Sequence, residues 1–185
     1  NSVFCLTFIQ VTDPGNLCTN TTTGTNSGGS ETENATDKGI IVGSVMTEEG
    51  YTVEGVSITL KSDSPLKGMT GATGDFIFQD IPFGKNYVVI PEKNTEVMNG
   101  ISTLDLVFMA KHITGTQGLD SPYKWVAADI DGNGSVSTLD LIRLRKLILH
   151  LDDQLPNNQT SWRFIDANVE FSDKQAPLNQ QYPSK

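Results

Sequence analysis

The sequence contains few of the residues on which catalysis and nucleic-acid binding depend. His112 and His150 are its only histidines, and 13 lysines and arginines are set against 22 aspartates and glutamates, for a net charge of −9. A nucleic-acid-binding surface needs a basic face, so the composition disfavours nucleic-acid partners. There is also no Gly-x-Ser-x-Gly elbow, no His-Glu-x-x-His zinc helix and no phosphate-binding loop. The sequence therefore predicts a protein that is not an enzyme and whose acidity suits divalent cations.

Long apolar runs are absent as well, and cysteine is scarce. No run approaches the roughly 18 to 20 apolar residues of a membrane span. The chain begins with neither a methionine nor a signal peptide, so we expect a mature or excised part of a longer protein. Cys5 and Cys18, the only cysteines, belong to no metal or redox motif. We expect a disulfide between them and a secreted, extracellular or cell-surface location, with two free thiols as the alternative.

One acidic stretch, residues 129–140, has the spacing of a calcium-binding loop. It reads DIDGNGSVSTLD, with oxygen-bearing side chains at alternating positions around a glycine. Calcium is held by oxygen ligands, and a loop of this kind supplies them from alternating positions and from its last residue. An acidic, glycine-rich surface turn is the alternative. The predicted ligands are Asp129, Asp131, Asn133, Ser135 through its carbonyl, Ser137 and Asp140.

The pattern occurs a second time, 35 residues upstream, since residues 101–107 read ISTLDLV and residues 136–142 read VSTLDLI. Met98 has no side-chain oxygen, and Asn99 stands where the later loop has a glycine. We therefore expect one Ca²⁺ in the later loop. The earlier loop either holds a second Ca²⁺ with the help of a main-chain carbonyl or is a metal-free turn. Its ligand positions fall on Asn94, Glu96, Met98, Gly100, Ser102 and Asp105.

The apolar residues after each loop recur with helical spacing, which predicts two packed helices. Ser121 and Pro122 provide the cap and the first residue of a shorter helix between them, over residues 123–128. We expect one small core, formed by Leu104, Val107, Phe108 and Ile113 on one helix and by Leu141, Leu144, Leu147, Ile148 and Leu151 on the other.

This duplicated loop and helix resembles a type I dockerin, a bacterial module of two calcium loop-helix repeats. The resemblance implies a calcium-stabilised module that docks onto a cohesin-like partner. Dockerins carry Ser or Thr recognition residues at loop positions 10 and 11. Here Thr103 and Thr138 keep position 10, whereas Leu104 and Leu139 occupy position 11. We expect the two leucines to pack within the module, which would weaken a cohesin surface.

Upstream, the sequence changes from a linker to short alternating strands. Residues 19–38 are rich in Thr, Ser, Gly and Asn, contain sequons at Asn20 and Asn34, and include no large apolar side chain. Residues 39–93 predict five strands, at 40–45, 53–60, 68–72, 75–79 and 86–90. This unit resembles the carboxypeptidase-regulatory-like β-sandwich, which implies a transthyretin-like scaffold without catalytic apparatus. Such sandwiches have about seven strands, so five strands predict open edges.

An N-terminal segment, residues 3–11, has apolar residues on both faces, as an interior strand does. Three placements are open for it. It completes the sheet of a neighbouring copy and so builds a fibre, it is the last strand of a severed preceding domain, or it completes its own sheet. The residues that a donated strand would contribute are Val3, Phe4, Leu6, Phe8, Ile9 and Val11.

Together these patterns predict an α+β chain in five parts: an orphan strand with the disulfide (1–18), a linker (19–38), a small transthyretin-like antiparallel β-sandwich (39–93), a dockerin-like calcium-binding helical module (94–155), and a return segment and tail (156–185). In the return segment we expect Trp162 and Phe164 to share a face that covers the module.

The predicted function is a non-catalytic extracellular structural protein. It would be a calcium-stabilised subunit of a surface filament or adhesin, with neighbouring copies or adjacent modules as partners, and loss of calcium should melt residues 94–151 first. Two alternatives remain open. One is a docking module for a cohesin-like partner, and the other is a surface that binds glycans through Tyr51, Tyr87, Trp125 and Trp162.

Overall fold

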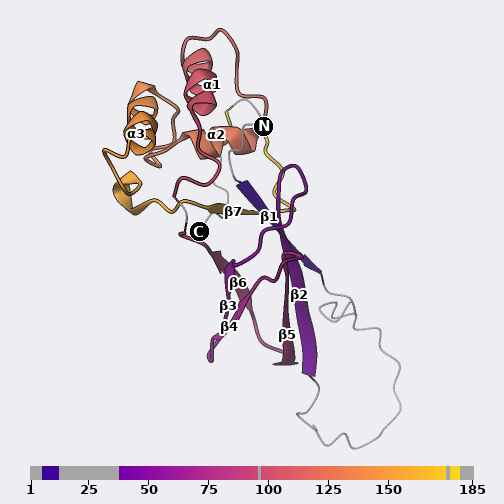
Figure 1. Ribbon diagram of the computed structural model, residues 1–185. Coiled ribbons are helices and arrows are strands. Elements are labelled where there is room, and N and C mark those ends of the chain that lie inside the picture. The colour runs from indigo at the N-terminus through magenta and orange to yellow at the C-terminus, as the bar shows by residue number, and fades with distance from the viewer. Residues whose placement is uncertain (1–5, 13–37, 96, 174–175, 180–185) are drawn as a thin grey trace, which may run out of the picture.

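The computed structural model describes residues 6–12, 38–95, 97–173 and 176–179 (Figure 1). For residues 6–12 the description covers the backbone and not the side chains. No helix of the described residues is long and apolar enough to cross a membrane. Several sequence predictions lie outside the described residues, namely those on Val3, Phe4, Cys5, Cys18, Asn20, Asn34 and Glu96.

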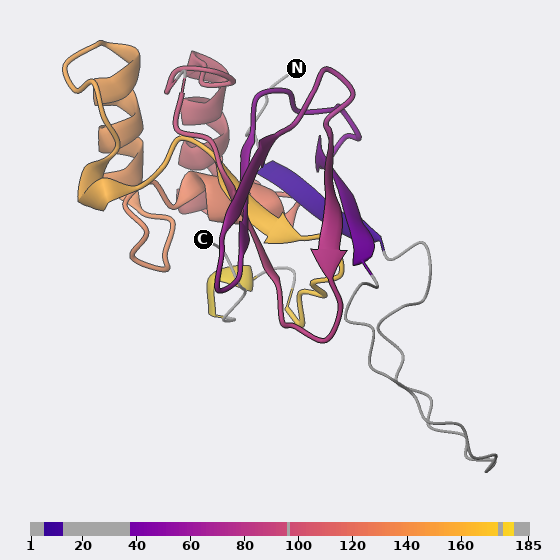
Figure 2. The same cartoon turned by 90° about the horizontal axis from the view of Figure 1, so that it is seen from below.

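In the part of the chain that the structure describes, seven strands form two sheets that pack face to face (Figures 1 and 2). The first sheet has the order β5-β2-β1-β7, and the second has the order β4-β3-β6. Their bounds are β1 Leu6–Thr12, β2 Lys38–Thr47, β3 Ser57–Lys61, β4 Leu66–Met69, β5 Asp75–Pro82, β6 Val88–Glu92 and β7 Arg163–Asp166. All neighbouring strands are antiparallel except β1 and β7, which are parallel.

The core between the sheets follows from the alternation of the strands. In β5, Phe76, Phe78 and Ile81 are buried while Asp75 and Ile77 are exposed, as expected of a strand with one face on a core. These three side chains pack against residues of β3 in the other sheet, of which Ile58 and Leu60 are fully buried. The five strands predicted from residues 39–93 are all present, with ends shifted by a few residues.

The first sheet is completed by two strands from outside residues 39–93, namely β1 and β7. The five strands predicted within residues 39–93 are therefore not the whole of the two sheets. β1 lies between β2 and β7 of its own chain, with Phe8 opposite Met46 and Ile165. This is the third of the three predicted placements, in which the N-terminal strand completes its own sheet. Donation to another copy gains no support from these pairings.

The three α-helices of the described residues form a layer above the sheets (Figure 1). α1 spans Thr103–Ile113, α2 spans Pro122–Ala128 and α3 spans Thr138–Ile148; α1 and α3 lie side by side, and α2 runs across their base (Figures 1 and 2). Met109 and Leu144 are buried at the centre of their core. The predicted core was partly wrong, because Leu104, Val107 and Leu151 are exposed.

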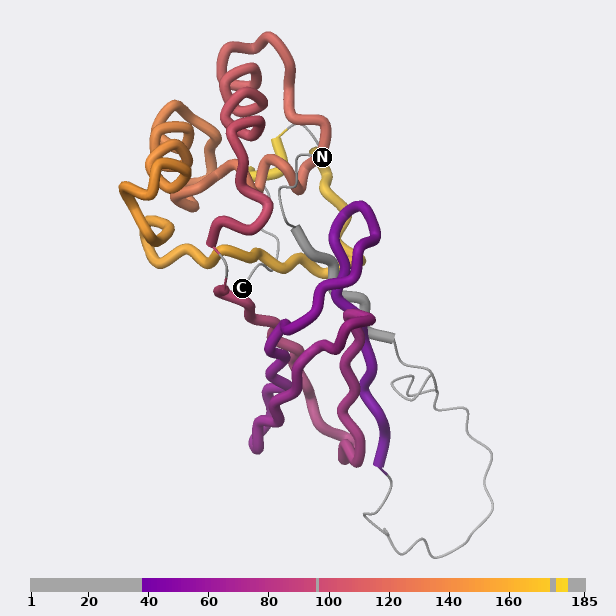
Figure 3. Tube along the Cα trace, viewed as in Figure 1, coloured from indigo at the N-terminus to yellow at the C-terminus, as the bar shows by residue number. Residues whose placement is uncertain are grey.

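The two layers interlock through the segment that follows α3. The chain leaves the sandwich, forms the helices and returns along β7 into the first sheet (Figure 3). Trp162 and Phe164 are buried in the core of the sandwich, so the prediction that they cover the helical module was wrong. Ile165, on the other face of β7, packs with Val126 of α2. One short strand thus contributes side chains to the sandwich core and to a smaller cluster that includes residues of α2.

Candidate metal centre

The loop between α2 and α3 is built by local backbone geometry. α2 ends at Ala128, and α3 begins at Thr138 after Ser137, whose hydroxyl accepts a hydrogen bond from Leu139 N at 3.2 Å. Gly132 and Gly134 both have positive φ, at 70° and 85°, a conformation that glycine adopts without steric cost. These two residues turn the chain sharply enough for the side chains on either side to converge.

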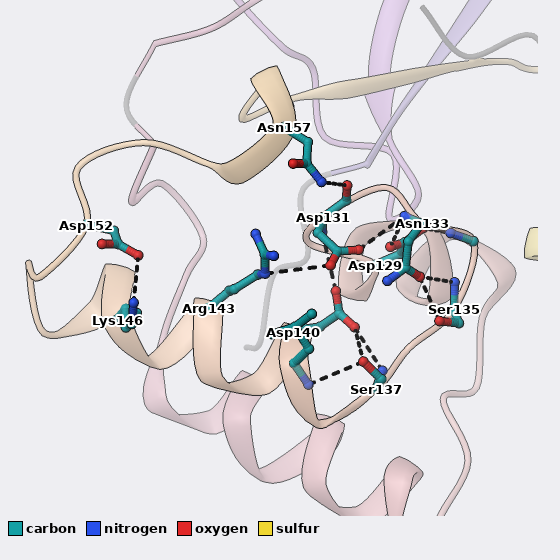
Figure 4. A network of polar contacts seen from close by, with 12 residues as sticks. Asp129, Asp131, Asn133, Ser135, Ser137, Asp140, Arg143, Lys146, Asp152 and Asn157 are labelled. Carbon is teal, nitrogen blue, oxygen red and sulfur yellow. Dashed lines mark hydrogen bonds and ion pairs between the residues drawn. The ribbon is translucent and has the colours of Figure 1, made fainter.

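Three carboxylates meet inside this loop (Figure 4). Ligand oxygens of Asp129, Asp131 and Asp140 all lie within 4.8 Å of one another, and all three residues are buried. They come from loop positions 1, 3 and 12, so residues eleven apart in sequence reach one point. Within the described residues this is the only group of three or more such side chains that could hold a metal ion.

Backbone N–H groups orient these carboxylates. Asp129 accepts hydrogen bonds from Asn133 N at 3.0 Å and from Gly134 N at 2.9 Å. Asp140 accepts from Ser137 N at 2.9 Å through one oxygen and from Asp131 N at 3.3 Å through the other. The carboxylates are therefore held in place by the loop itself.

The charge of the cluster calls for a cation. Burial raises the pKa of the Asp129 carboxyl, against the hydrogen bonds from Gly134 and Asn133, which lower it. Buried carboxylates this close repel one another. Arg143 Nε lies 3.6 Å from Asp131 Oδ2, and the positive charge of Arg163 lowers the pKa of Asp129. Two guanidinium groups do not balance three carboxylates. An all-oxygen donor set of this kind fits Ca²⁺, a hard cation.

The remaining predicted ligands lie at the rim of the cluster. Asn133 and Ser135 are exposed, and Asn133 Oδ1 accepts from both the N–H and the hydroxyl of Ser135. Ser137 donates its hydroxyl to Asp140 Oδ2 at 2.9 Å. The three carboxylates thus form the buried centre, and the neutral oxygens remain at the solvent side.

The earlier loop differs in its first half. Asn94 Oδ1 accepts a hydrogen bond from Ser161 N at 3.1 Å, which ties it to the return segment. The positive φ falls on Gly100, at 78°, one position later than the glycine of the second loop. Met98 contributes its main-chain carbonyl to Ile101 N rather than a side-chain oxygen. The match between the two loops is therefore confined to the second half.

The second half of the earlier loop repeats the later one closely. Asp105 is 1% exposed, and its Oδ2 accepts from the N–H and the hydroxyl of Ser102 at 2.7 and 2.9 Å, as Asp140 does from Ser137. Its other oxygen, Oδ1, is buried and has no hydrogen-bond partner among the described residues. A buried carboxylate oxygen without a partner is costly, and a bound cation would remove that cost. This oxygen fits a second Ca²⁺.

We predict that Asp105→Asn lowers the number of calcium ions bound per chain from two to one. The asparagine keeps the shape and the contact with Ser102 but removes the charge that the ion needs. Isothermal titration calorimetry measures the stoichiometry, and Glu92→Gln, an exposed acidic change on β6, is the matched control. One ion per chain in the wild type would show that the earlier loop is a metal-free turn.

Three residues that the sequence did not single out fasten the later loop to the return segment and to β7. Asn157 Nδ2 donates to Asp131 O at 3.0 Å (Figure 4). A methyl group at Gly132 would collide with the side-chain amide of Gln159, which shows how closely Gln159 covers the loop. Arg163, the first residue of β7, donates to Val126 O and Asp129 O at 2.8 and 2.6 Å. No local pattern marks these residues, because their partners lie 26 to 37 residues away.

The residues at loop positions 10 and 11 lie on an exposed face. Thr103 and Thr138 are exposed, and Leu104 and Leu139 are 42% and 44% exposed. The prediction that the two leucines pack within the module was therefore wrong. Asp105 must point inward to its loop, and Leu104 precedes it by one residue, about 100° around the helix, so it points away. The same holds for Leu139 and Asp140.

Comparison with known proteins gives one match. A family model for the Dockerin type I domain matches residues 99–168, rather more than a third of the chain. No curated protein and no solved structure matches the chain. Dockerin type I domains bind Ca²⁺, act as non-catalytic docking modules and occur in extracellular proteins. The family match and the cluster of Asp129, Asp131 and Asp140 indicate the same cofactor, calcium, for residues 99–168.

Proposed function

We propose that residues 99–168 form a calcium-dependent docking module that binds a cohesin-like partner, within a non-catalytic protein that works outside the cell. The family match supports the docking activity. The observation that carries the proposal is the exposed position of the recognition residues in both repeats. The structural role predicted first, as a filament or adhesin subunit, becomes the second candidate.

The face proposed for docking has an apolar centre. On α1 it presents Leu104 and Val107, and on α3 it presents Leu139 and Ile142, each between 42% and 50% exposed. These four large apolar side chains are exposed at matching positions of the two repeats, and exposed apolar side chains that gather on one surface mark an interaction site. Thr103 and Thr138 lie beside the leucines and offer hydroxyls for hydrogen bonds.

The positive charge beside this face indicates which charge the partner's surface should carry. A groove between α1 and α3 includes Val107 of the face and is also lined by Lys111 and Arg145. The chain as a whole is acidic, with a net charge of −9, so two cations beside this face are a local feature of the surface. We expect the partner to present an apolar patch with acidic residues at its rim.

Calcium would act by fixing the start of each helix. Asp105 and Asp140 are third residues of α1 and α3, and each also closes its loop. When Ca²⁺ is bound, it supplies the positive charge that holds the loop carboxylates together. Asp105 and Asp140 then set the direction of the helices that carry the docking leucines.

The test is binding of the full chain to an immobilised cohesin domain, measured by surface plasmon resonance with calcium and with chelator. We predict that the double variant Leu104→Asp/Leu139→Asp weakens binding by at least about 100-fold, because burying an unpaired carboxylate in an apolar interface costs several kcal/mol. Leu66→Asp, a change of similar exposure on β4, is the control. Equal binding by both variants, or binding unaffected by chelator, would contradict the proposal.

We keep the second candidate, a calcium-stabilised subunit of a surface filament or adhesin, because of the length of the connection between β1 and β2; the pairing of β1 within its own chain does not support it. β1 is an interior strand of the first sheet, although a long connection separates it from β2. The glycan-binding alternative is weakened by the burial of Trp162, whose ring lies under Lys93 Nζ in the sandwich core. Tyr51 is exposed, but a single exposed ring does not make a sugar-binding platform.

A further inference from the structure

β1 fills a slot with two hydrogen-bonding edges. On one side it pairs with β2 in antiparallel register from Thr7 opposite Thr47 to Thr12 opposite Val42. On the other side it pairs with β7 in parallel, from Leu6 opposite Arg163 to Ile9 opposite Asp166. Without β1, both edges would present unpaired N–H and C=O groups, which attract another strand.

The connection from β1 to β2 is much longer than this pairing needs. Since Thr12 lies opposite Val42, Lys38 is only four residues farther along β2, on the order of 14 Å in a strand. About five residues would span that gap. The chain uses the residues between 12 and 38, 25 in all, and those from 19 onward include no large apolar side chain.

The excess length lowers the advantage of pairing within one chain. Loop-closure statistics make the local concentration of β1 at its own slot on the order of ten-fold lower with 25 residues than with five. The effective concentration of two groups joined by a short connection is about millimolar, and it falls as the connection lengthens. A strand from a second copy forms the same backbone pairs, so it competes once copies are crowded to a similar concentration.

Both walls of the slot have contacts besides those with β1, although β1 is the only strand that pairs with β7. β2 also pairs with β5 along its other edge. β7 is fixed by Arg163, which donates to Val126 O and Asp129 O at the entry of the calcium loop, and by Trp162 and Phe164 in the sandwich core. The slot can therefore receive a strand from outside.

We propose that β1 of one copy enters the slot between β2 and β7 of a second copy, and that this exchange joins copies of the chain. Reciprocal exchange closes a dimer, whereas one-way exchange leaves a slot at one end and a strand at the other and so extends the assembly. The inference rests on the second candidate function. It does not involve the docking face on α1 and α3.

Disulfide trapping between single-cysteine chains tests this proposal. In a Cys5→Ser/Cys18→Ser background, one chain carries Gln10→Cys and the other carries Ser44→Cys, which are register partners across β1 and β2. The two chains are mixed, unfolded, refolded with calcium at about 10 µM to 1 mM, the upper limit matching the effective concentration, and then oxidised. A bond between the two introduced thiols in this mixture can form only between different chains.

We expect a linked product whose yield rises with protein concentration. Gln10→Cys mixed with Thr116→Cys, an exposed residue after α1, gives the background of random collision, and each single variant alone gives the background of self-pairing. The double variant Gln10→Cys/Ser44→Cys shows that the site can be oxidised within one chain. If that variant closes internally while the mixture stays at background over the whole range, the proposal is overturned.

Sedimentation velocity uses the unmodified chain, so its result does not depend on whether a variant folds. Exchange predicts that the mean mass rises with concentration over the same range, and that Leu104→Asp/Leu139→Asp leaves this rise unchanged. A monomer at every concentration would also overturn the proposal. Loss of cohesin binding with exchange intact would instead contradict only the docking function.

Discussion

Replacing Asp140 with asparagine is expected to abolish high-affinity calcium binding by the later loop. Asp140 is fully buried, and its two oxygens accept hydrogen bonds from Ser137 and from Asp131 N, so it ties the end of the loop to its beginning. Asparagine keeps the shape and an acceptor but removes one of three clustered charges. We expect the calcium affinity to fall by more than the roughly 10- to 100-fold that loss of an outer-shell partner costs.

The free energy of unfolding should distinguish loss of calcium binding from a general destabilisation of the fold. Calcium at about 100 times its Kd stabilises a folded site by about 2.7 kcal/mol. The increment that the later loop contributes should disappear in Asp140→Asn, so that only calcium binding by the earlier loop still raises the stability. The metal-free variant should be at least as stable as the metal-free wild type, because one of three mutually repelling carboxylates is gone.

Thermal unfolding with calcium and with chelator measures both quantities. Asp153→Asn, an exposed change in the loop after α3, is the matched control and should keep the full calcium-dependent rise in Tm. A variant that keeps the rise would show that Asp140 is not a ligand. A metal-free variant that is far less stable than the metal-free wild type would show a structural role alone.

The effect of calcium removal should extend beyond the helices. The sequence predicts that residues 94–151 melt first. However, the hydrogen bonds of Asn157 with Asp131 O and of Arg163 with Asp129 O connect the loop to the return segment and to β7. β7 is in turn the parallel partner of β1. A loosened loop therefore weakens one wall of the slot that holds β1.

The calcium loop could be predicted from sequence because all its parts are local. Asp129, Asp131 and Asp140 lie within twelve residues, and glycines at fixed positions provide the turn that brings the carboxylates together. Helical spacing likewise predicted α1 and α3. Helical spacing failed to predict that Leu104 and Val107 are exposed. The buried loop carboxylate fixes which face of the helix points inward, and spacing alone does not show this.

The contacts that join the two layers could not be predicted. β1 pairs with β7 across more than 150 residues, and Arg163 reaches a carbonyl of α2 37 residues away. Such pairings depend on the arrangement of the whole chain and leave no periodic signal. The apolar faces of residues 3–11 showed that an interior strand was present, but they did not identify the sheet.

Replacing Trp162 with alanine is expected to destabilise the sandwich by about 3–5 kcal/mol, the range for large aromatic side chains removed from a core. Trp162 is 5% exposed and packs with residues of both sheets. It also precedes β7, so the cavity would lie where the return segment enters the first sheet. Loss of this anchor should therefore weaken the sandwich and the attachment of the calcium module together.

Urea unfolding, followed by circular dichroism in saturating calcium, measures the free energy of unfolding. Tyr51→Ala, which removes a 68% exposed ring from the same sandwich, should change it by no more than about 0.5 kcal/mol. If Trp162 were a surface platform for sugars, its replacement would have the same small effect as that of Tyr51. A loss below about 1 kcal/mol would mean that the return segment is not part of the core, because a buried tryptophan cannot be removed so cheaply.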